Sequence, residues 1–239
     1  MSGLKGKKVV VVGGTSGIGL AVAIAALEDG AKVIVGSSQQ KGVDAAVQKL
    51  GDTAAAGATV DVTNEDDVKQ FFERVGAFDH LVYTAGDWTS MGGGPIAELD
   101  LALAQGAFRV RFWGALAMIK HGHRRLGEGG SITLTDGMMA HRPRKAMAVA
   151  TAMLGAIEHL VKGLAIDLAP LRVNAVCPGF VLTERAESYP EDVRKRFTQA
   201  LPLARAAKPA EIAEAYLYLM RGGYTTGQVL LADGGGSLV

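Results

Sequence analysis

The sequence has few of the residues on which several classes of protein depend. It contains a single cysteine, Cys177, which excludes an intrachain disulfide and any metal site built on paired cysteines. It has no run of about 18 apolar residues that could span a membrane. No charged-then-apolar leader is evident either, since Lys5, Lys7 and Lys8 lead straight into a short apolar stretch. We therefore expect a cytoplasmic protein with no membrane partner.

Neither sign of charge dominates the sequence. The 239 residues include 25 Lys and Arg against 24 Asp and Glu, a formal net charge of +1. Such a balance supplies no general attraction to nucleic acid or to an anionic membrane. We therefore expect a small-molecule substrate and no nucleic-acid partner. The length suits one α/β domain spanning residues 1–239.

The chain is organised around a strand, a glycine turn and a helix near its start. Residues 9–12 are four valines, typical of a strand with both faces buried in a parallel sheet. Gly13, Gly17 and Gly19 follow, and residues 20–27 are mostly helix formers. Such a turn directs unpaired N–H groups and the positive end of a helix dipole at its ligand, and glycines allow a pyrophosphate to come close. The spacing therefore predicts a dinucleotide site.

The rest of the chain alternates short strands with helices and shows no internal repeat. Further strands are expected at residues 32–35, 58–62, 79–84, 131–135, 173–176 and 228–231. Helices are expected at residues 44–50, 65–75, 99–126, 146–168 and 211–220, with a helical substrate lid at about 184–208. This order predicts a single-domain, doubly wound Rossmann fold, in which helices flank a seven-stranded parallel sheet and the ligand crevice lies at the carboxyl ends of the strands.

Several motifs together resemble those of the short-chain dehydrogenase/reductase family. The glycine turn is similar to the family signature Thr-Gly-x-x-x-Gly-Ile-Gly, with Val12 in place of Thr. The further matches are Asp61-Val62, Tyr83-Thr84-Ala85-Gly86, Arg172 to Gly179, Thr183, Thr226-Gly227-Gln228 and Asp233-Gly234-Gly235. The resemblance covers nearly the whole chain and implies an oxidoreductase that uses a nicotinamide dinucleotide.

The resemblance also implies where the cofactor would bind. The residues that it places around the pyrophosphate are Gly13, Thr15, Ser16, Gly17, Ile18 and Gly19. Those placed at the adenine and the ribose are Asp61, Val62, Ala85 and Gly86. Those placed at the nicotinamide are Pro178, Gly179, Val181 and Thr183. Small residues suit these positions because bulk there would push the cofactor out.

The loop after the second expected strand favours NADP(H). In a dinucleotide fold, an acidic residue about 20 positions past the glycines binds the adenosine ribose of NAD, whereas NADP needs donors or positive charge there. This loop has no acid before Asp44. Ser37, Ser38 and Lys41 can instead donate to a 2′-phosphate.

The groups that carry the family's ordinary chemistry are missing. That chemistry uses a Tyr to donate a proton, a Lys four residues later to lower the pKa of the Tyr, a Ser to polarise the carbonyl and an Asn on a neighbouring helix. Alignment on the flanking motifs puts Ala150, Leu154, Gly137 and Arg111 at these positions. No Tyr-x-x-x-Lys occurs in the chain.

Two residues at the vacated positions are candidates for substitute chemistry. Asp136 follows the fifth expected strand immediately before Gly137, and Arg111 lies on the helix across from it. The alternative is that Asp136 caps a turn and Arg111 forms a salt bridge. The candidates for lining a substrate pocket are Trp88, His141, Ala150, Leu154 and Tyr189. For these, packing or a solvated loop is the alternative.

The charge state of Asp136 decides between two chemistries. Paired directly with Arg111, it would be an anion that holds an iminium cation, which needs only hydride. Buried away from Arg111, it could act as a general acid, and ketones would also be substrates. We expect an atypical NADP(H)-dependent reductase of a C=N or C=O group, with imines ranked first. The alternatives are a catalytically silent NADP-binding subunit or sensor, and a non-redox lyase or cyclase on the same scaffold.

The helix expected at residues 146–168 carries many small residues, which suit close packing. By resemblance it would pack on a second copy of the chain. We therefore expect a homo-oligomer, either a tetramer or a dimer.

Overall fold

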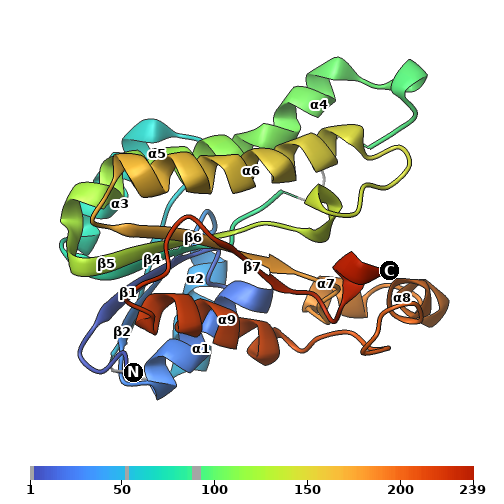
Figure 1. Ribbon diagram of the computed structural model, residues 1–239. Coiled ribbons are helices and arrows are strands. Elements are labelled where there is room, and N and C mark those ends of the chain that lie inside the picture. Colours follow the sequence, from blue (N-terminus) through green and yellow to red (C-terminus); the bar gives the residue numbers. More distant parts are fainter. Residues whose placement is uncertain (1–2, 52–53, 88–92) are drawn as a thin grey trace.

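The computed structural model describes residues 3–51, 54–87 and 93–239. They form one parallel sheet with helices on both faces (Figure 1). The strand order is β3-β2-β1-β4-β5-β6-β7, and every neighbouring pair is parallel. This architecture confirms the predicted doubly wound fold.

The strands are short and mostly buried. Their bounds are β1 Lys8–Val12, β2 Lys32–Ser37, β3 Ala55–Thr59, β4 Phe78–Tyr83, β5 Leu126–Thr135, β6 Arg172–Pro178 and β7 Val229–Ala232. The valines of β1 are almost fully buried because helices cover the sheet on both sides. β1 pairs with both β2 and β4, so the strand order reverses there. In such sheets the ligand crevice lies at this reversal, outside the carboxyl ends of the strands.

The helices divide into two layers with separate cores (Figure 1). On one face lie α1 (Gly17–Glu28), α2 (Gln40–Leu50) and α9 (Pro209–Arg221). On the other lie α3 (Glu65–Val75), α5 (Ala115–Gly122) and α6 (Ala148–Asp167). The successive valines of β1 and their neighbours alternate between the two cores, as the period of a strand requires.

Several sequence-based boundaries need correction. α2 begins at Gln40 instead of residue 44, so Lys41 lies in its first turn, and β5 begins at Leu126 instead of residue 131. β3 occupies Ala55–Thr59 instead of residues 58–62, because its pairing with β2 aligns Val33 with Ala55 and Ser37 with Thr59. Val60 and Val62 remain buried, but beyond the ladder. The stretch expected as one helix at 99–126 is divided into α4 (Leu101–Phe108), a π-helical turn at Arg109–Gly114 and α5.

The segment predicted as a lid contains two short helices, α7 (Glu184–Glu187) and α8 (Glu191–Thr198). They lie beside the carboxyl ends of β6 and β7 (Figure 1). Within the described residues, one helix, α6, is long and apolar enough to cross a membrane by length and composition alone. Its buried side packs in the core against the sheet, which is the arrangement of a core helix.

Candidate active site at the carboxyl ends of the strands

The glycine turn after β1 is too tightly packed for side chains. Gly13 has φ +82°, and a Cβ there would lie 2.6 Å from the amide nitrogen of Ala85. A Cβ on Gly19 would lie 2.2 Å from the carbonyl oxygen of Gly13. Ser16, at the N-cap of α1, makes no side-chain capping bond. The Ser16 side chain therefore does not occupy the first amides of α1, and a turn of this kind fits a pyrophosphate.

One of these amides already has an anionic partner. The Gly17 N–H donates to Oε2 of Glu184 over 3.0 Å. A Cβ on Gly17 would meet Cγ2 of Thr183 at 3.1 Å, so the start of α7 lies directly against the glycine turn. Sequence reasoning missed Glu184. Its position immediately after Thr183 was the available signal.

The remaining turn residues Thr15 and Ile18 are half-buried beside the same turn. On the adenosine side, Ser37 ends β2 and is half-buried, while Ser38 and Lys41 are exposed. Val62 is buried. Asp61 accepts hydrogen bonds from the amide and the hydroxyl of Thr63, which lower the pKa of the Asp61 carboxyl. These positions are compatible with the predicted adenosine site, and their roles remain predictions.

Arg111 lies in the π-helical turn and points into the interior. Only 6% of the residue is exposed. Its Nη1 donates to the carbonyl oxygen of Thr135 over 3.2 Å. A Cβ on Gly86 would come 2.3 Å from its Nη2, so the guanidinium packs directly on the Ala85-Gly86 turn. π-Helical turns occur frequently at functional sites, and this one was not visible in the sequence.

Two of the positions that the alignment identifies as vacated are neighbours in space. A Cβ on Gly137 would lie 3.2 Å from Cδ1 of Leu154, so the serine and lysine positions are neighbours. Ala150 is fully buried, and Leu154 is 3% exposed. The tyrosine and lysine positions thus form a closed apolar wall. Whether they line a substrate remains a prediction.

Asp136 lies at the end of β5, between this wall and Arg111. It is 2% exposed, and neither carboxyl oxygen receives a hydrogen-bond donor in good geometry. Burial raises the pKa of Asp136 to about 8. The Gly137 amide and Arg111 lower this pKa, whereas the carboxyl of Glu158 raises it further. The net effect of these surroundings favours the protonated form of Asp136, which a general acid requires. Arg111 also acts on this carboxyl, so the choice between a paired anion and a buried acid remains a prediction.

Two other side chains complete the cluster around Asp136. Nε2 of His141 lies 2.8 Å from Oε1 of Glu158, although neither atom is aligned for a normal hydrogen bond.

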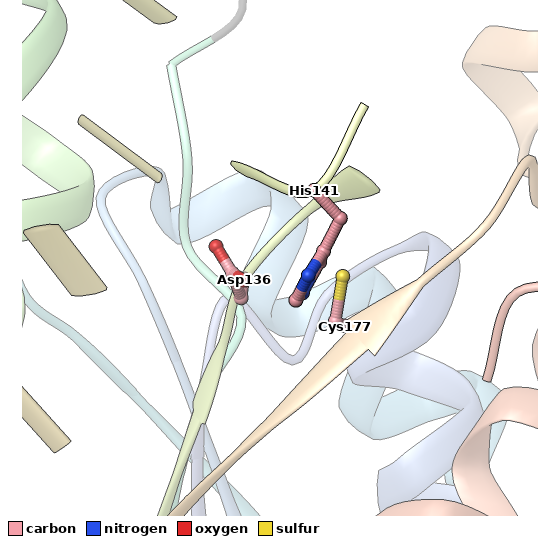
Figure 2. Close-up of side chains that lie close together, drawn as sticks. All are labelled: Asp136, His141 and Cys177. Atoms are coloured by element: carbon pink, nitrogen blue, oxygen red, sulfur yellow. The ribbon is translucent and has the colours of Figure 1, made fainter. Parts of the chain in front are cut away.

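In Figure 2 the His141 ring lies between Asp136 and Cys177, and one ligand atom of each lies within 4.8 Å of the others. These atom types suit zinc. Burial raises the pKa of the Cys177 thiol well above its usual range in the metal-free protein.

The turn after β6 is joined to the predicted lid. Phe180 stacks on Phe197 of α8 with ring centroids 4.8 Å apart, and the Arg144 guanidinium lies 4.5 Å from the Phe197 ring. Within the same turn, a Cβ on Gly179 would lie 2.7 Å from Cα of Asp233. The lid therefore rests on the predicted nicotinamide turn.

Other predicted residues of this region are placed as follows. Pro178 ends β6, and Val181 pairs with Ala207 in an isolated bridge. The Thr183 hydroxyl accepts from the Ala186 amide and caps α7. The Tyr189 hydroxyl accepts from Nε of Arg185, within the lid itself. Trp88 lies outside the described residues.

A cleft beside the predicted nicotinamide turn does not contain Asp136. This cleft, about 450 Å³ in volume, lies between the Gly179-Phe180 turn, the end of the lid segment and the start of α9. None of the vacated catalytic positions lines it. The chemistry we assign to Asp136 therefore rests on the side-chain cluster and not on this cleft.

Comparison with known proteins settles the family. A family profile described as "Enoyl-(Acyl carrier protein) reductase" matches residues 12–237. The chain is 34% identical over 256 residues to "Short-chain dehydrogenase/reductase ATR9" of Stachybotrys chlorohalonatus, and all of both chains is covered. The chain belongs to the short-chain dehydrogenase/reductase family. As a member of that family it is an oxidoreductase.

Two solved structures are similar to this short-chain dehydrogenase/reductase. The MalC Reductase/Diels-Alderase of Malbranchea aurantiaca is 31% identical, with a TM-score of 0.91 and coverage of 99% of this chain and 98% of that one. A small-chain dehydrogenase in complex with NADPH is 35% identical, with a TM-score of 0.80 and coverage of 98% and 100%.

Proposed function

We propose that this protein is an NADP(H)-dependent reductase of a C=N or C=O group of a small molecule. The observation that carries the proposal is the burial of Asp136 beside the vacated serine position, where the pKa of its carboxyl is raised. When bound, the cofactor supplies the hydride. Asp136 supplies the proton that the family's tyrosine would otherwise give.

An acid of this kind suits an imine better than a ketone. An imine nitrogen is far more basic than a carbonyl oxygen, so it can take the proton before hydride arrives. A ketone must instead be polarised during the reaction, and Gly137 offers no hydroxyl for that purpose. Arg111, held by Thr135 and Gly86, stabilises the Asp136 anion that remains. Imine reduction therefore ranks above ketone reduction.

The cofactor preference is part of the proposal. The end of β2 and the start of α2 carry Ser37, Ser38 and Lys41. No carboxylate occurs in this stretch before Asp44. The relative solved with NADPH supports the same choice. We expect tighter binding of NADPH than of NADH in a fluorescence titration, and Lys41→Ala should narrow the difference. Equal affinities, or tighter NADH, would contradict the preference.

A second candidate is a cycloaddition or another non-redox step on the same scaffold. The observation that favours it is the likeness to a protein whose title combines reductase and Diels-Alderase. The two candidates differ in their need for cofactor, because a cyclase turns over without consuming NADPH. A catalytically silent subunit would show neither reaction.

The test compares wild type, Asp136→Asn and the matched surface control Asp66→Asn. Each is assayed with NADPH against a panel of cyclic imines and the corresponding ketones. We expect wild type and control to reduce imines faster than ketones, and Asp136→Asn to be slower by a factor of about 100 or more. Full activity of Asp136→Asn would exclude Asp136 as the acid. No NADPH consumption by wild type on any member of the panel would count against the reductase.

A further inference from the structure

Asp136 is separated from solvent, yet a side chain that donates a proton must regain one after every turnover. It is 2% exposed, and its oxygens receive no well-aligned donor. The neighbouring Ala150 and Leu154 are apolar and buried, so the wall beside it offers no polar path. A proton from solvent therefore has to reach Asp136 through polar neighbours on the side away from Ala150 and Leu154.

We propose that Glu158 and His141 form a proton relay that connects Asp136 with solvent, an inference that rests on the proposed function. In this relay Glu158 exchanges a proton with Asp136, and His141 exchanges it with Glu158. Glu158 is assigned no contact with substrate or cofactor, and the relay does not depend on the pocket-lining role that the sequence predicts for His141. They act through Asp136.

The geometry supplies each link of the relay. The Glu158 carboxyl lies close enough to Asp136 to raise the pKa of that group, and an oxygen of Asp136 lies within 4.8 Å of a ring nitrogen of His141. Two neighbouring carboxyl groups are most stable when they share one proton. His141 Nε2 lies 2.8 Å from Oε1 of Glu158. A small rotation of the ring would align its N–H with that oxygen. Exposure rises along the chain of groups, from 2% at Asp136 to side-chain values of 16% at Glu158 and 28% at His141.

The fold fixes the three groups on different elements. Asp136 follows β5, His141 follows the short 3₁₀ turn at Met138–Ala140, and Glu158 lies on α6. Glu158 is one helical turn beyond Leu154, so its side chain continues the face of α6 that covers the lysine position. Glu158 thus lies on the same helix as the apolar wall, one turn farther along it.

Other charged or titratable groups face this cluster from the remaining elements. Arg111 approaches Asp136 from the π-helical turn, and Cys177 lies beside it on β6. Tyr216 of α9 bonds to Thr135, and Asp233 after β7 acts on Cys177. Burial raises the pKa of the Cys177 thiol and of the Tyr216 hydroxyl far above neutrality, so neither releases a proton to the relay.

The proton balance closes without another reactant. The O–H bond of Asp136 breaks as an N–H bond forms on the substrate, and the hydride of the proposed reaction completes the reduction. The Asp136–Glu158 pair has then lost the one proton that it shared. His141 gives a proton to Glu158, which passes it to Asp136, and His141 takes up a proton from solvent at its exposed edge.

The kinetic test separates the first turnover from later ones. Asp136 begins with its proton, so His141→Ala should keep a nearly normal single-turnover rate but lose about tenfold in the steady state. Free imidazole should restore part of that loss. The matched control is His159→Ala, because His159 lies next to Glu158 on the exposed side of α6 and bonds to the Gly155 carbonyl. Steady-state rates of His141→Ala equal to those of the control would overturn the relay.

A second measurement needs neither substrate nor cofactor. Infrared spectra of the protein at neutral pH should contain a protonated carboxyl band that disappears in Asp136→Asn and shifts in Glu158→Gln. A band that is the same in wild type and Glu158→Gln would overturn the relay even if the enzyme reduces imines. If the wild type reduces no substrate while the band shifts as expected, the proposed function fails and the shared proton stands.

Metal analysis provides the remaining control. Zinc that copurifies in equimolar amount and is lost in Cys177→Ser would overturn the relay, because His141 and Asp136 would then be ligands. A metal-free protein with the expected infrared shift supports it.

Discussion

At the scale of single residues, the buried Asp136 links catalysis to stability. Its pKa is raised to about 8 in the folded protein, against about 4 in an unfolded chain. The folded state therefore binds this proton more tightly, and the carboxyl stabilises the fold at low pH. That contribution is lost as the pH rises from about 4 through about 8.

Asp136→Asn should remove this dependence. Relative to the variant, wild type should lose more than about 1 kcal/mol of unfolding free energy between about pH 5 and about pH 8, since one pKa unit corresponds to roughly 1.4 kcal/mol. Urea unfolding of both proteins across this range measures the difference. Parallel curves would show that Asp136 is ionised in the folded protein.

The sequence predicts some of these residues and not others. Asp136 and Arg111 stand out because flanking motifs locate them at vacated positions. Whether they pair is not visible in sequence, because it depends on the π-helical turn that directs Arg111 to Gly86 and Thr135. Glu158 is missed because a lone acid on a helix ordinarily faces solvent. Only the packing of α6 beside β5 brings it to Asp136.

At the scale of elements, a side chain of α7 and the expected cofactor would compete for the same amide at the start of α1. The Glu184 carboxylate occupies the Gly17 amide that a cofactor pyrophosphate would need. If the pyrophosphate binds there as predicted, Glu184 has to leave this amide, because two anions cannot share it. We therefore expect the contact to hold the start of α7 against the glycine turn and to weaken nucleotide binding.

Glu184→Gln should bind NADPH a few-fold more tightly, since a charge-assisted hydrogen bond is replaced by a weaker neutral one. Glu187→Gln is the matched control, because it removes the same charge from α7 without a described contact to the glycine turn. Titration of nucleotide fluorescence measures both. Equal affinities of the two variants would show that the Gly17 contact does not compete with the cofactor.

By our alignment, α6 lacks both the catalytic side chains of an ordinary family site and the space that they would occupy. Ala150 is fully buried, and Leu154 packs where a hydroxyl on Gly137 would project. The double variant Ala150→Tyr with Leu154→Lys should therefore overpack the interior and lose roughly 1–3 kcal/mol of stability. It should remain a poor ketone reductase because Gly137 and Arg111 are unchanged. Thermal unfolding and a ketone assay test both points, and rapid ketone turnover would contradict our placement of the site.

At the scale of the whole molecule, the fold follows from local patterns more closely than the site does. The valines of β1, the glycine turn and the alternation of strands with helices are enough to predict the sheet. β3 is misplaced because strand propensity favours Val60 and Val62, whereas the register with β2 decides the ladder. Asp136 and His141 are close in sequence, but Glu158 joins them only through the packing of α6 beside the end of β5, which local patterns do not encode.

The layer formed by α4, α5 and α6 (Figure 1) carries several large apolar side chains that are exposed. Leu101 on α4 is 70% exposed, Trp113 in the π-helical turn 59% and Ile166 on α6 80%. A groove of about 480 Å³ adjoins Trp113. The surface around Gly163 is open, since a Cβ there would meet nothing within 4 Å. Such a surface is typical of an interface between copies of a chain.

We therefore predict a dimer or tetramer that buries this face. Trp113→Glu should shift the protein toward smaller species, because a buried charge without a partner is costly. Gly163→Arg should do the same by filling the open surface of α6. Tyr224→Glu is the control, since Tyr224 is fully exposed outside these helices. Light scattering at micromolar concentration gives the mass of each species. A monomeric wild type would refute the prediction, and an oligomer that survives both substitutions would place the interface on another face.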